Sequence, residues 1–375
     1  MGKNEKNDKS AELIGKRLAN KFHLQSLIGE GGFGAVFRAR DQDTNQIYAI
    51  KILYLDNKMT PAQRVKEFQF FQREVGILAR VRHPGIVHVY DGGLTEEGLP
   101  YLVMEMVEGE LLSNIFKAEG RLSLYRVTSI FSQLCAAVAT IHQQGIIHRD
   151  LKPENIMVRR DNEGNEIIKL LDFGLAKVVR GETDNKWLGT LTGRGQIHGT
   201  IYYMSPEQCE GKKLDERTDI YSLGVMIYEL LAGKPPFHAS SPLGIMAQHL
   251  DTLPPPLRAQ RPDLPVEVEI AILKALEKDR NKRYQNVLDF SNRLEQIAAD
   301  CAVAQLRAGG DPNARPETGV RTQVIPIDER RLTVEIDTKP HKTNSLPINA
   351  GVKIESKTTR RMSRLWEFLN KLKGE

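Results

Sequence analysis

The feature that most constrains this chain is the stretch His148-Arg-Asp-Leu-Lys-Pro-Glu-Asn155, which is followed seventeen residues later by Asp172-Phe-Gly174. Asp150 can accept or orient the proton of a substrate hydroxyl, and Lys152 can balance negative charge on a phosphoryl group as it moves. Asn155 and Asp172 carry the oxygen ligands that Mg²⁺ binds in proteins. The two motifs therefore predict a site where a proton acceptor, a cation and a bound metal come together.

A second motif, Gly29-Glu-Gly-Gly-Phe-Gly34, matches the G-x-G-x-x-G pattern of loops that approach phosphates. The pattern alone is weak, because dinucleotide-binding folds share it, and a nicotinamide-dependent oxidoreductase is the alternative that it raises. A dinucleotide loop runs into a helix, whereas Val36-Phe-Arg-Ala39 continues as a strand. The sequence therefore favours a glycine-rich hairpin whose backbone N–H groups lie over nucleotide phosphates.

Lys51 ends the apolar run Tyr48-Ala-Ile-Lys51, seventeen residues after Gly34. A lysine in such a position is usually a solvated surface residue, but one hairpin away from a phosphate loop it can neutralise phosphate oxygens as a point charge. It then needs a carboxylate to hold it in place. Glu74 lies among apolar positions of a predicted helix and is the first choice, with Glu67 as the alternative.

The first part of the chain predicts a small β-rich lobe that carries one helix. Alternating residues and turns over residues 22–54 indicate a strand, the glycine loop, a strand, a turn and a strand. Pro61 opens a helical pattern that runs to about Val81. Two further strands are expected near residues 86–90 and 101–106.

From Ser123 onward the patterns become long and helical, so the second lobe should be mostly helical. Two short apolar runs flank a turn-rich stretch at residues 161–165 and predict a hairpin that returns Asp172 to Asn155. The expected fold class is α+β, with a small antiparallel β lobe and a larger, mainly helical lobe. The apolar runs cover residues 155–159 and 167–171, and the helices cover 123–144, 217–232, 265–277 and 284–299.

At 375 residues, with 40% hydrophobic and 27% charged residues, the chain is long enough for one large two-lobed domain and a tail. No run approaches the ~20 apolar residues of a membrane-spanning helix, since the best candidate, 223–232, is short and contains Glu229. The first residues lack the apolar core of a signal peptide, so we expect a cytoplasmic protein. The three cysteines, far apart and odd in number, predict neither disulfides nor a zinc site.

The net charge of +5 belongs to the C-terminal tail. Residues 301–375 carry 14 Lys and Arg against 9 Asp and Glu, whereas residues 1–300 carry 39 of each kind. The core therefore gives no reason to expect nucleic-acid binding.

Taken in order, these motifs resemble the eukaryotic-like protein kinase family, and specifically its bacterial (Hanks-type) serine/threonine branch. The resemblance covers residues 22–298 and includes the glycine loop with Val36, the Ala-Ile-Lys strand, His-Arg-Asp with its asparagine, Asp-Phe-Gly and Ser205-Pro-Glu207. Lys152 and the segment Gly199-Thr-Ile-Tyr-Tyr-Met-Ser-Pro-Glu207 are similar to the serine/threonine-specific members. One departure is mild: Ser205 stands where the family often has alanine.

The resemblance implies a two-lobed protein kinase fold and a serine/threonine protein kinase. Such an enzyme transfers the γ-phosphoryl group of ATP, bound with Mg²⁺ or with Mn²⁺ in its place, to hydroxyls of proteins, its own included. ATP and protein substrates are the expected partners. The alternatives are a pseudokinase scaffold and a small-molecule kinase of similar fold. The complete set of Lys51, Glu74, Asp150, Asn155 and Asp172 favours an active enzyme.

The resemblance also implies structural roles for residues of the large lobe. Asp219 would hold the backbone of the catalytic loop, and Glu207 would pair with Arg283. In the nucleotide site, aliphatic side chains would enclose the adenine ring, and the backbone between the lobes would bind its edge. The residues expected to contact ATP are Ile28, Gly29, Glu30, Gly31, Gly32, Phe33, Gly34, Val36, Ala49, Lys51, Glu74, Met104, Glu105, Val107 and Met157.

The loop that follows Asp-Phe-Gly is expected to carry activating phosphates. Arg149, directly before the catalytic aspartate, can bind such a phosphate and order the loop, although local packing is an alternative role for it. Thr190 and Thr192 are the expected phosphate acceptors, and Thr183 is the next candidate after them. Thr200 is expected to contact the catalytic loop directly.

The chain is therefore expected to divide into a polar N-terminal segment (1–21), a kinase domain (22–299, with lobes 22–107 and 108–299), a disordered linker (300–360) and a basic amphipathic helix (361–375). Such a helix can lie weakly on an anionic membrane or dock on a partner, and packing on the kinase domain is its alternative. A cytoplasmic location, peripheral at the membrane, and a homodimer for autophosphorylation are the corresponding expectations.

Overall fold

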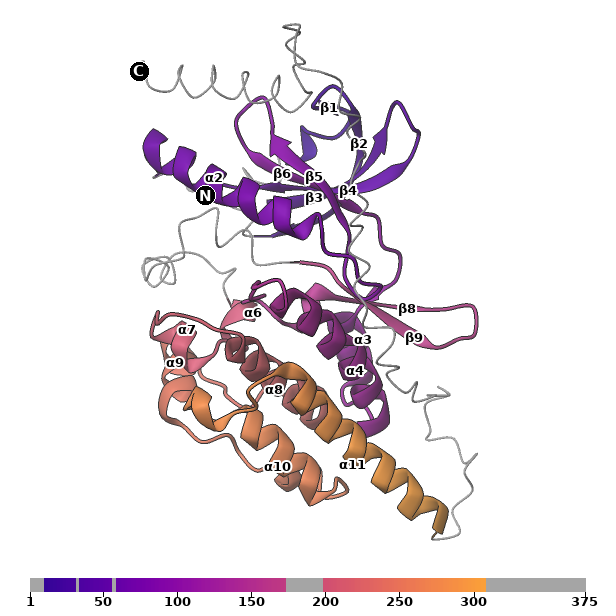
Figure 1. The fold of residues 1–375 in the computed structure, drawn as a ribbon, viewed down its shortest axis with the longest axis vertical. Helices are drawn as coiled ribbons and strands as arrows, with labels where there is room; N and C mark the ends of the chain where they lie inside the picture. The colour runs from indigo at the N-terminus through magenta and orange to yellow at the C-terminus, as the bar shows by residue number, and fades with distance from the viewer. Residues whose placement is uncertain (1–9, 32–33, 56–58, 173–197, 308–375) are drawn as a thin grey trace, which may run out of the picture.

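The computed structural model describes residues 10–31, 34–55, 59–172 and 198–307. It has two lobes, a twisted sheet with one long helix and a larger group of helices, one above the other in Figure 1. The expected α+β class with two lobes is confirmed.

The small lobe is built on a six-stranded sheet with the strand order β1-β2-β3-β4-β6-β5, in which all neighbouring strands are antiparallel. The three strands expected over residues 22–54 are confirmed. The next strand begins at Val89 and not at Ile86, because Ile86 instead bridges to Leu170 of the large lobe. The strands are β1 (Arg17–Leu18), β2 (Phe22–Gly31), β3 (Gly34–Asp41), β4 (Ile47–Leu53), β5 (Val89–Leu94) and β6 (Pro100–Glu105).

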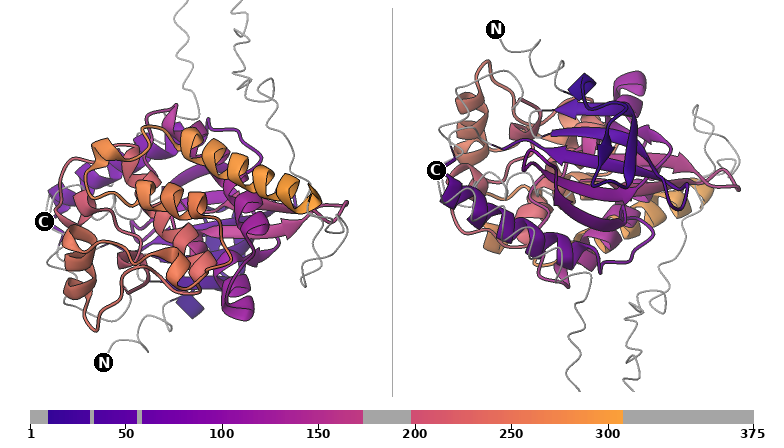
Figure 2. Two further views of the ribbon diagram at one scale, coloured as in Figure 1. Left: turned by 90° about the horizontal axis from the view of Figure 1, so that it is seen from below. Right: turned by 90° about the horizontal axis from the view of Figure 1, so that it is seen from above.

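The two faces of this sheet have separate cores, because alternate residues of a strand point to opposite sides. Ile50 and Ile52 of β4 belong to a buried cluster on one face, whereas Ala49 belongs to the cluster shared with helix α2 (Pro61–Leu78). Seen from above, α2 lies beside the sheet (Figure 2). Lys51 shares the face of Ala49, so it projects toward the side that α2 covers.

Helix α2 begins where the sequence predicts. Thr60 and Gln63 form a capping box that satisfies backbone N–H groups at its start, and Pro61 at the first position loses no helical hydrogen bond. The helix ends at Leu78, three residues before the expected Val81.

Helix α8 (Arg217–Ala232) forms the centre of the large lobe, and nearly all of its residues are buried. Helices α4 (Leu124–His142), α10 (Val266–Ala275) and α11 (Val287–Arg307) share its apolar core. The bounds of α8 are those expected from the sequence, and Gly233 (φ 87°) ends it in the left-handed region. Helix α4 is long and apolar enough to cross a membrane, but most of it is buried inside this core.

Helix α11 begins three residues later than the expected Tyr284 and runs beyond the expected Ala299. Shorter elements complete the large lobe. The other helices are α3 (Leu112–Glu119), α6 (His198–Ile201), α7 (Pro206–Cys209) and α9 (Pro242–Asp251), with 3₁₀ turns η1 (Pro153–Asn155), η3 (Leu257–Ala259) and η4 (Arg280–Lys282).

A three-stranded sheet joins the lobes, with the order β7 (Glu110–Leu111), β8 (Ile156–Arg160) and β9 (Glu166–Leu170). The hairpin expected from the two apolar runs is therefore confirmed. Leu170 also accepts a hydrogen bond from the N–H of Val87 at 2.9 Å, which ties β9 to the small lobe. Leu171 and Asp172, which follow β9 within the described residues, consequently lie between the two lobes.

Candidate active site

The glycine-rich motif covers the end of β2 and the start of β3. Gly31 pairs with Gly34, and Gly29 pairs with Val36. A Cβ atom at Gly34 (φ 157°) would lie 2.1 Å from the carbonyl oxygen of Ile52, so no other residue fits without a shift of the backbone. The predicted residues Gly32 and Phe33 lie outside the described residues.

Lys51 lies directly across β3 from this turn, paired with Val36, and its side chain is buried. Its ammonium group forms an ion pair with the carboxylate of Asp172. The expected partner Glu74 is half-buried on α2, and within the part of the chain described here it makes no ion pair with Lys51. The expected Lys51–Glu74 pair is thus not formed among the described residues of this structure, in which Asp172 pairs with Lys51 instead.

The catalytic loop is held from below by Asp219. Its buried carboxylate accepts hydrogen bonds from the backbone N–H groups of His148 (2.8 Å) and Arg149 (2.9 Å), as expected. His142 also contacts it, at 2.7 Å. Burial alone raises the pKa of Asp219, but the hydrogen bond and charge of His142 outweigh it, so the pKa is lowered. The ionised carboxylate can therefore stabilise the loop, in which Arg149 has a positive φ of 65°.

Asp150 lies within a network of its own loop. Lys152 is 2.9 Å from its carboxylate, and the amide nitrogen of Asn155 donates to its backbone oxygen at 2.8 Å. Lys152 also donates to the hydroxyl of Thr200 at 2.9 Å, so the expected contact of Thr200 with the catalytic loop is confirmed. Burial lowers the pKa of Lys152, but the charge of Asp150 outweighs this effect and the pKa is raised. Lys152 stays cationic beside the aspartate.

Asn155 and Asp172 are brought together by a backbone contact, since the N–H of Leu171 donates to the backbone oxygen of Asn155 at 2.9 Å. The amide nitrogen of Asn155 donates to Asp150, and no residue that the structure describes donates to its side-chain oxygen. That oxygen and the half-exposed carboxylate of Asp172 fit a hard cation such as Mg²⁺, which takes only one or two protein ligands beside phosphates.

The residues expected around adenine come from both lobes. Ala49 pairs with Met104 across β4 and β6, and both are buried. Val36, Val107 and Met157 are half-buried, whereas Ile28 is 50% exposed. The exposed flanks of this apolar group are what a planar ring would cover.

Glu105 makes a contact that the sequence did not reveal. Its carboxylate pairs with Lys169 of β9 at 2.7 Å, and its backbone N–H donates to His88 at 2.8 Å. The side chain therefore joins the two lobes.

The segment after the activation loop is fixed by a buried ion pair. Arg283 donates to both oxygens of Glu207, as expected, and Thr218 donates to one of them at 2.8 Å. Ser205 caps α7, so the departure from alanine adds a hydrogen bond to the N–H of Gln208.

A buried acid that the sequence analysis did not single out lies nearby. Glu229 of α8 accepts a hydrogen bond from the hydroxyl of Tyr203. Burial raises the pKa of Glu229 to about 7. The negative charge of Glu154 also raises this pKa, whereas the hydrogen bond from Tyr203 lowers it. The available signal was a single glutamate within the apolar run 223–232.

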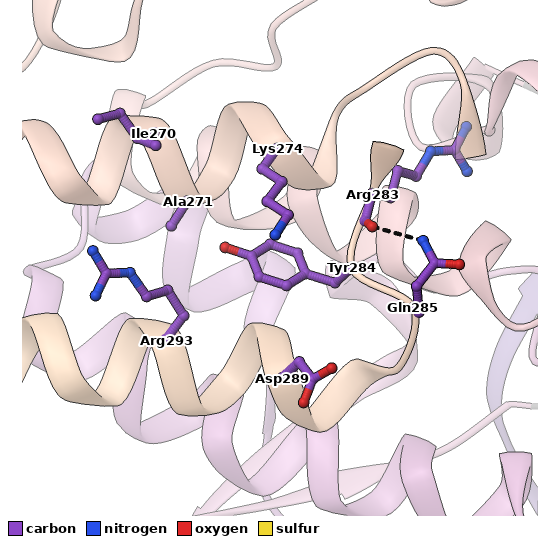
Figure 3. A pocket seen from close by; sticks show the side chains of 8 residues that line it. All are labelled: Ile270, Ala271, Lys274, Arg283, Tyr284, Gln285, Asp289 and Arg293. Carbon is purple, nitrogen blue, oxygen red and sulfur yellow. Dashed lines mark hydrogen bonds between the residues drawn. The ribbon is translucent and has the colours of Figure 1, made fainter. Parts of the chain in front are cut away.

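A hollow of about 550 Å³ lies elsewhere, between α10 and α11 (Figure 3). Lys274 lies 4.4 Å above the ring of Tyr284 there. Among the described residues that line it, Arg283 was assigned a role from the sequence, and its guanidinium forms the ion pair with Glu207. The hollow is therefore separate from the candidate active site.

The glycine hairpin, the buried lysine and the Asp150 network lie in a two-lobed fold, an arrangement typical of protein kinases. The chain belongs to the protein kinase family: the model of the protein kinase domain matches residues 22–299.

The chain is similar to bacterial serine/threonine kinases. It is 34% identical to the serine/threonine-protein kinase pkn3 of Myxococcus xanthus over 93% of this chain and 65% of that protein. It is 37% identical to PknB of Mycolicibacterium smegmatis over 75% of this chain and 44% of that protein. The kinase domain of PknI from Mycobacterium tuberculosis matches with a TM-score of 0.58 and 26% identity, over 76% of this chain and 98% of that domain. The chain spans only part of the length of the two curated relatives.

Proposed function

We propose that the chain is an active serine/threonine protein kinase, which transfers the γ-phosphoryl group of ATP to Ser and Thr hydroxyls of proteins, itself included. The observation that carries this proposal is the network around Asp150, in which Lys152 links the aspartate to Thr200. A scaffold without activity has no need of a complete set of these groups. The pseudokinase alternative therefore has no support in the site.

Each side chain has a role that its surroundings favour. Asp150 orients the substrate hydroxyl and accepts its proton, and Lys152 offsets charge on the phosphoryl group. Lys51 binds phosphate oxygens of ATP, with Glu74 as a carboxylate that could take the place of Asp172 beside it. Asn155 and Asp172 would hold Mg²⁺, or Mn²⁺, which shields the phosphate charge when bound.

The test is phosphorylation of a generic protein substrate by the full chain with Mg²⁺ and ATP. Asp150→Asn should lower the rate at least ~100-fold, since it removes one charged group at the reacting atoms. The same variant should still bind ATP, because Asp150 is not among the nucleotide contacts. Phosphate should appear on Ser and Thr and not on Tyr. Full activity of Asp150→Asn, or phosphotyrosine alone, would overturn the proposal.

The activation loop lies outside the described residues, and with it Thr190 and Thr192. We retain both as phosphoacceptors because Arg149 can bind a phosphate of this loop. Arg149 lies in the catalytic loop, where its backbone N–H is hydrogen-bonded to Asp219. After incubation with ATP, mass spectrometry should find phosphate on this pair. Full activity of a Thr190→Ala, Thr192→Ala double variant would show that the switch lies elsewhere.

The helix expected over residues 361–375 also lies outside the described residues. Its basic, amphipathic sequence supports weak contact with an anionic membrane, so that a cytoplasmic kinase would be peripheral at the membrane. Co-sedimentation with anionic vesicles should fall when the chain ends at Thr359, and should weaken as salt rises. A homodimer formed for autophosphorylation would make the initial rate of self-phosphorylation rise with the square of protein concentration.

A further inference from the structure

The residues before the kinase motifs form an ordered arm, which we define as residues 10–18. The C-terminal part of the arm is hydrogen-bonded to β2. The N–H of Gly15 donates to the backbone oxygen of Leu24 at 2.8 Å, and the N–H of Leu24 donates to the backbone oxygen of Lys16 at 3.0 Å. Leu18 is buried in the apolar cluster on the sheet face opposite α2, which we call the outer face, and Leu13 packs against this outer cluster. The sequence analysis expected only a polar segment here, so the arm is an addition to the small lobe.

The other end of the arm reaches the glycine-rich hairpin. Ser10 is only 1% exposed. Its hydroxyl donates to the carboxylate of Glu30 at 2.9 Å and lies 2.6 Å from the hydroxyl of Tyr54. Tyr54 itself donates to the same oxygen of Glu30 at 2.7 Å. Three oxygens from three separate segments therefore meet at one point, with two hydroxyl donors for one carboxylate.

This contact lies on the side of the hairpin away from Lys51. Glu30 pairs with Ala35, which belongs to the outer cluster, whereas the preceding Gly29 pairs with Val36 on the inner side next to Lys51. Side chains of directly paired residues point to the same face. Glu30 is thus held on the outer face, away from the side on which phosphates would lie.

The protonation of Tyr54 suits this arrangement. Burial raises the pKa of Tyr54 to about 12, with the charge of Glu30 acting in the same direction and the contact with Ser10 against it. The phenol therefore remains a donor to the carboxylate at neutral pH.

We propose that Ser10 and Tyr54 are positioning residues for the glycine-rich hairpin: by binding Glu30 from the outer face, they hold the hairpin in the position from which it binds the phosphates of ATP. This inference rests on the proposed function, since it assigns ATP to the site. A glycine-rich turn has many accessible conformations, and fixing one of its few side chains lowers the entropy that is lost when phosphates bind.

The test is nucleotide binding by the full chain, measured by calorimetry with two probes. The magnesium complex of the β,γ-imido analogue of ATP carries the phosphates, and adenosine lacks them. Ser10→Ala and Tyr54→Phe should each weaken binding of the analogue about 3- to 10-fold, which is the size of the net contribution of one ordinary intramolecular hydrogen bond. Both should leave adenosine affinity within about twofold, because adenosine lacks the phosphates that the glycine-rich turn would bind.

Kinetics separate positioning from a loss of stability. The KM for ATP should rise by the same factor with little change in kcat, since the lost contact serves ground and transition states alike. A purely structural defect would lower kcat through a smaller folded fraction and leave KM unchanged. Ser10→Thr keeps the hydroxyl and should restore wild-type KM. Ser26→Ala is the matched control, because Ser26 is an exposed serine on the same strand.

Two results would overturn the inference: wild-type affinity of Ser10→Ala and Tyr54→Phe for the ATP analogue, or an equal loss of affinity for adenosine. Failure of the proposed function would look different, because the wild-type chain itself would then fail to phosphorylate protein. The binding comparison needs no turnover and remains decisive in that case.

Discussion

Arg283 donates two hydrogen bonds to Glu207, over 2.7 and 2.9 Å, and both side chains are buried. Removing one partner of a buried pair leaves an uncompensated charge, which costs about 3–5 kcal/mol. We expect Arg283→Met to lower the free energy of unfolding by that amount, and the addition of Glu207→Gln to restore part of it. Urea unfolding measures both. A double variant no more stable than Arg283→Met would contradict the pairing argument.

Thr200 should matter through its hydroxyl. The group accepts a hydrogen bond from Lys152, which also contacts Asp150. Thr200→Val keeps the shape but removes one of the two oxygen partners of the Lys152 ammonium group, and should lower kcat about 10-fold or more. Thr200→Ser keeps the oxygen and should stay near wild type. Steady-state kinetics with a protein substrate test this, and equal losses in both variants would point to packing.

Gly34 and Gly31 offer a matched pair in the same turn. A Cβ at Gly34 would meet the carbonyl oxygen of Ile52 at 2.1 Å, whereas a Cβ at Gly31 meets nothing within 4 Å. Gly34→Ala should therefore lower the free energy of unfolding by about 1–3 kcal/mol through backbone strain, and Gly31→Ala should change it little. Thermal or urea unfolding of the two variants is the measurement. A tolerated Gly34→Ala would mean that the hairpin can move away from β4.

Glu229 should make stability depend on pH. Burial raises its folded-state pKa to about 7 from an ordinary value of 4.5. The folded protein thus holds this proton to higher pH than the unfolded chain, so stability falls as pH rises from 4.5 to about 7 and is level on either side. The full effect is on the order of 3 kcal/mol.

Glu229→Gln removes this titration and isolates it. The difference in unfolding free energy between Glu229→Gln and wild type should shift in favour of the variant between pH 4.5 and pH 8. Groups that titrate in both proteins cancel in that difference. A difference that stays constant over this range would show that folding does not raise the pKa of Glu229.

Long-range contacts between motif residues could be predicted from the sequence. Asp219 with the backbone of His148, and Thr200 with Lys152, form as expected. They were predictable because the family resemblance fixes which motif meets which. The hairpin between Asn155 and Asp172 was predictable on physical grounds alone, since two apolar runs around a turn pair locally.

Contacts outside the motifs were not predictable. Ser10 lies in a polar stretch with no periodic signal, and its partners Glu30 and Tyr54 are 20 and 44 residues away. Lys51 illustrates the opposite case, in which the position was inferred but Asp172 was not expected as its partner. Which of two carboxylates reaches Lys51 depends on how the two lobes meet, and local patterns carry no information about that arrangement.

The ion pair between Lys51 and Asp172 has a consequence for binding. The two charges that we propose bind a nucleotide and its divalent cation already compensate one another. If a nucleotide binds Lys51 without a cation, the carboxylate of Asp172 loses its partner and lies uncompensated beside the phosphates. If a cation binds Asp172 without a nucleotide, the ammonium group of Lys51 is left uncompensated. Both ligands together exchange one ion pair for two. Nucleotide and cation should therefore show positive, reciprocal linkage, each binding more tightly when the other is present.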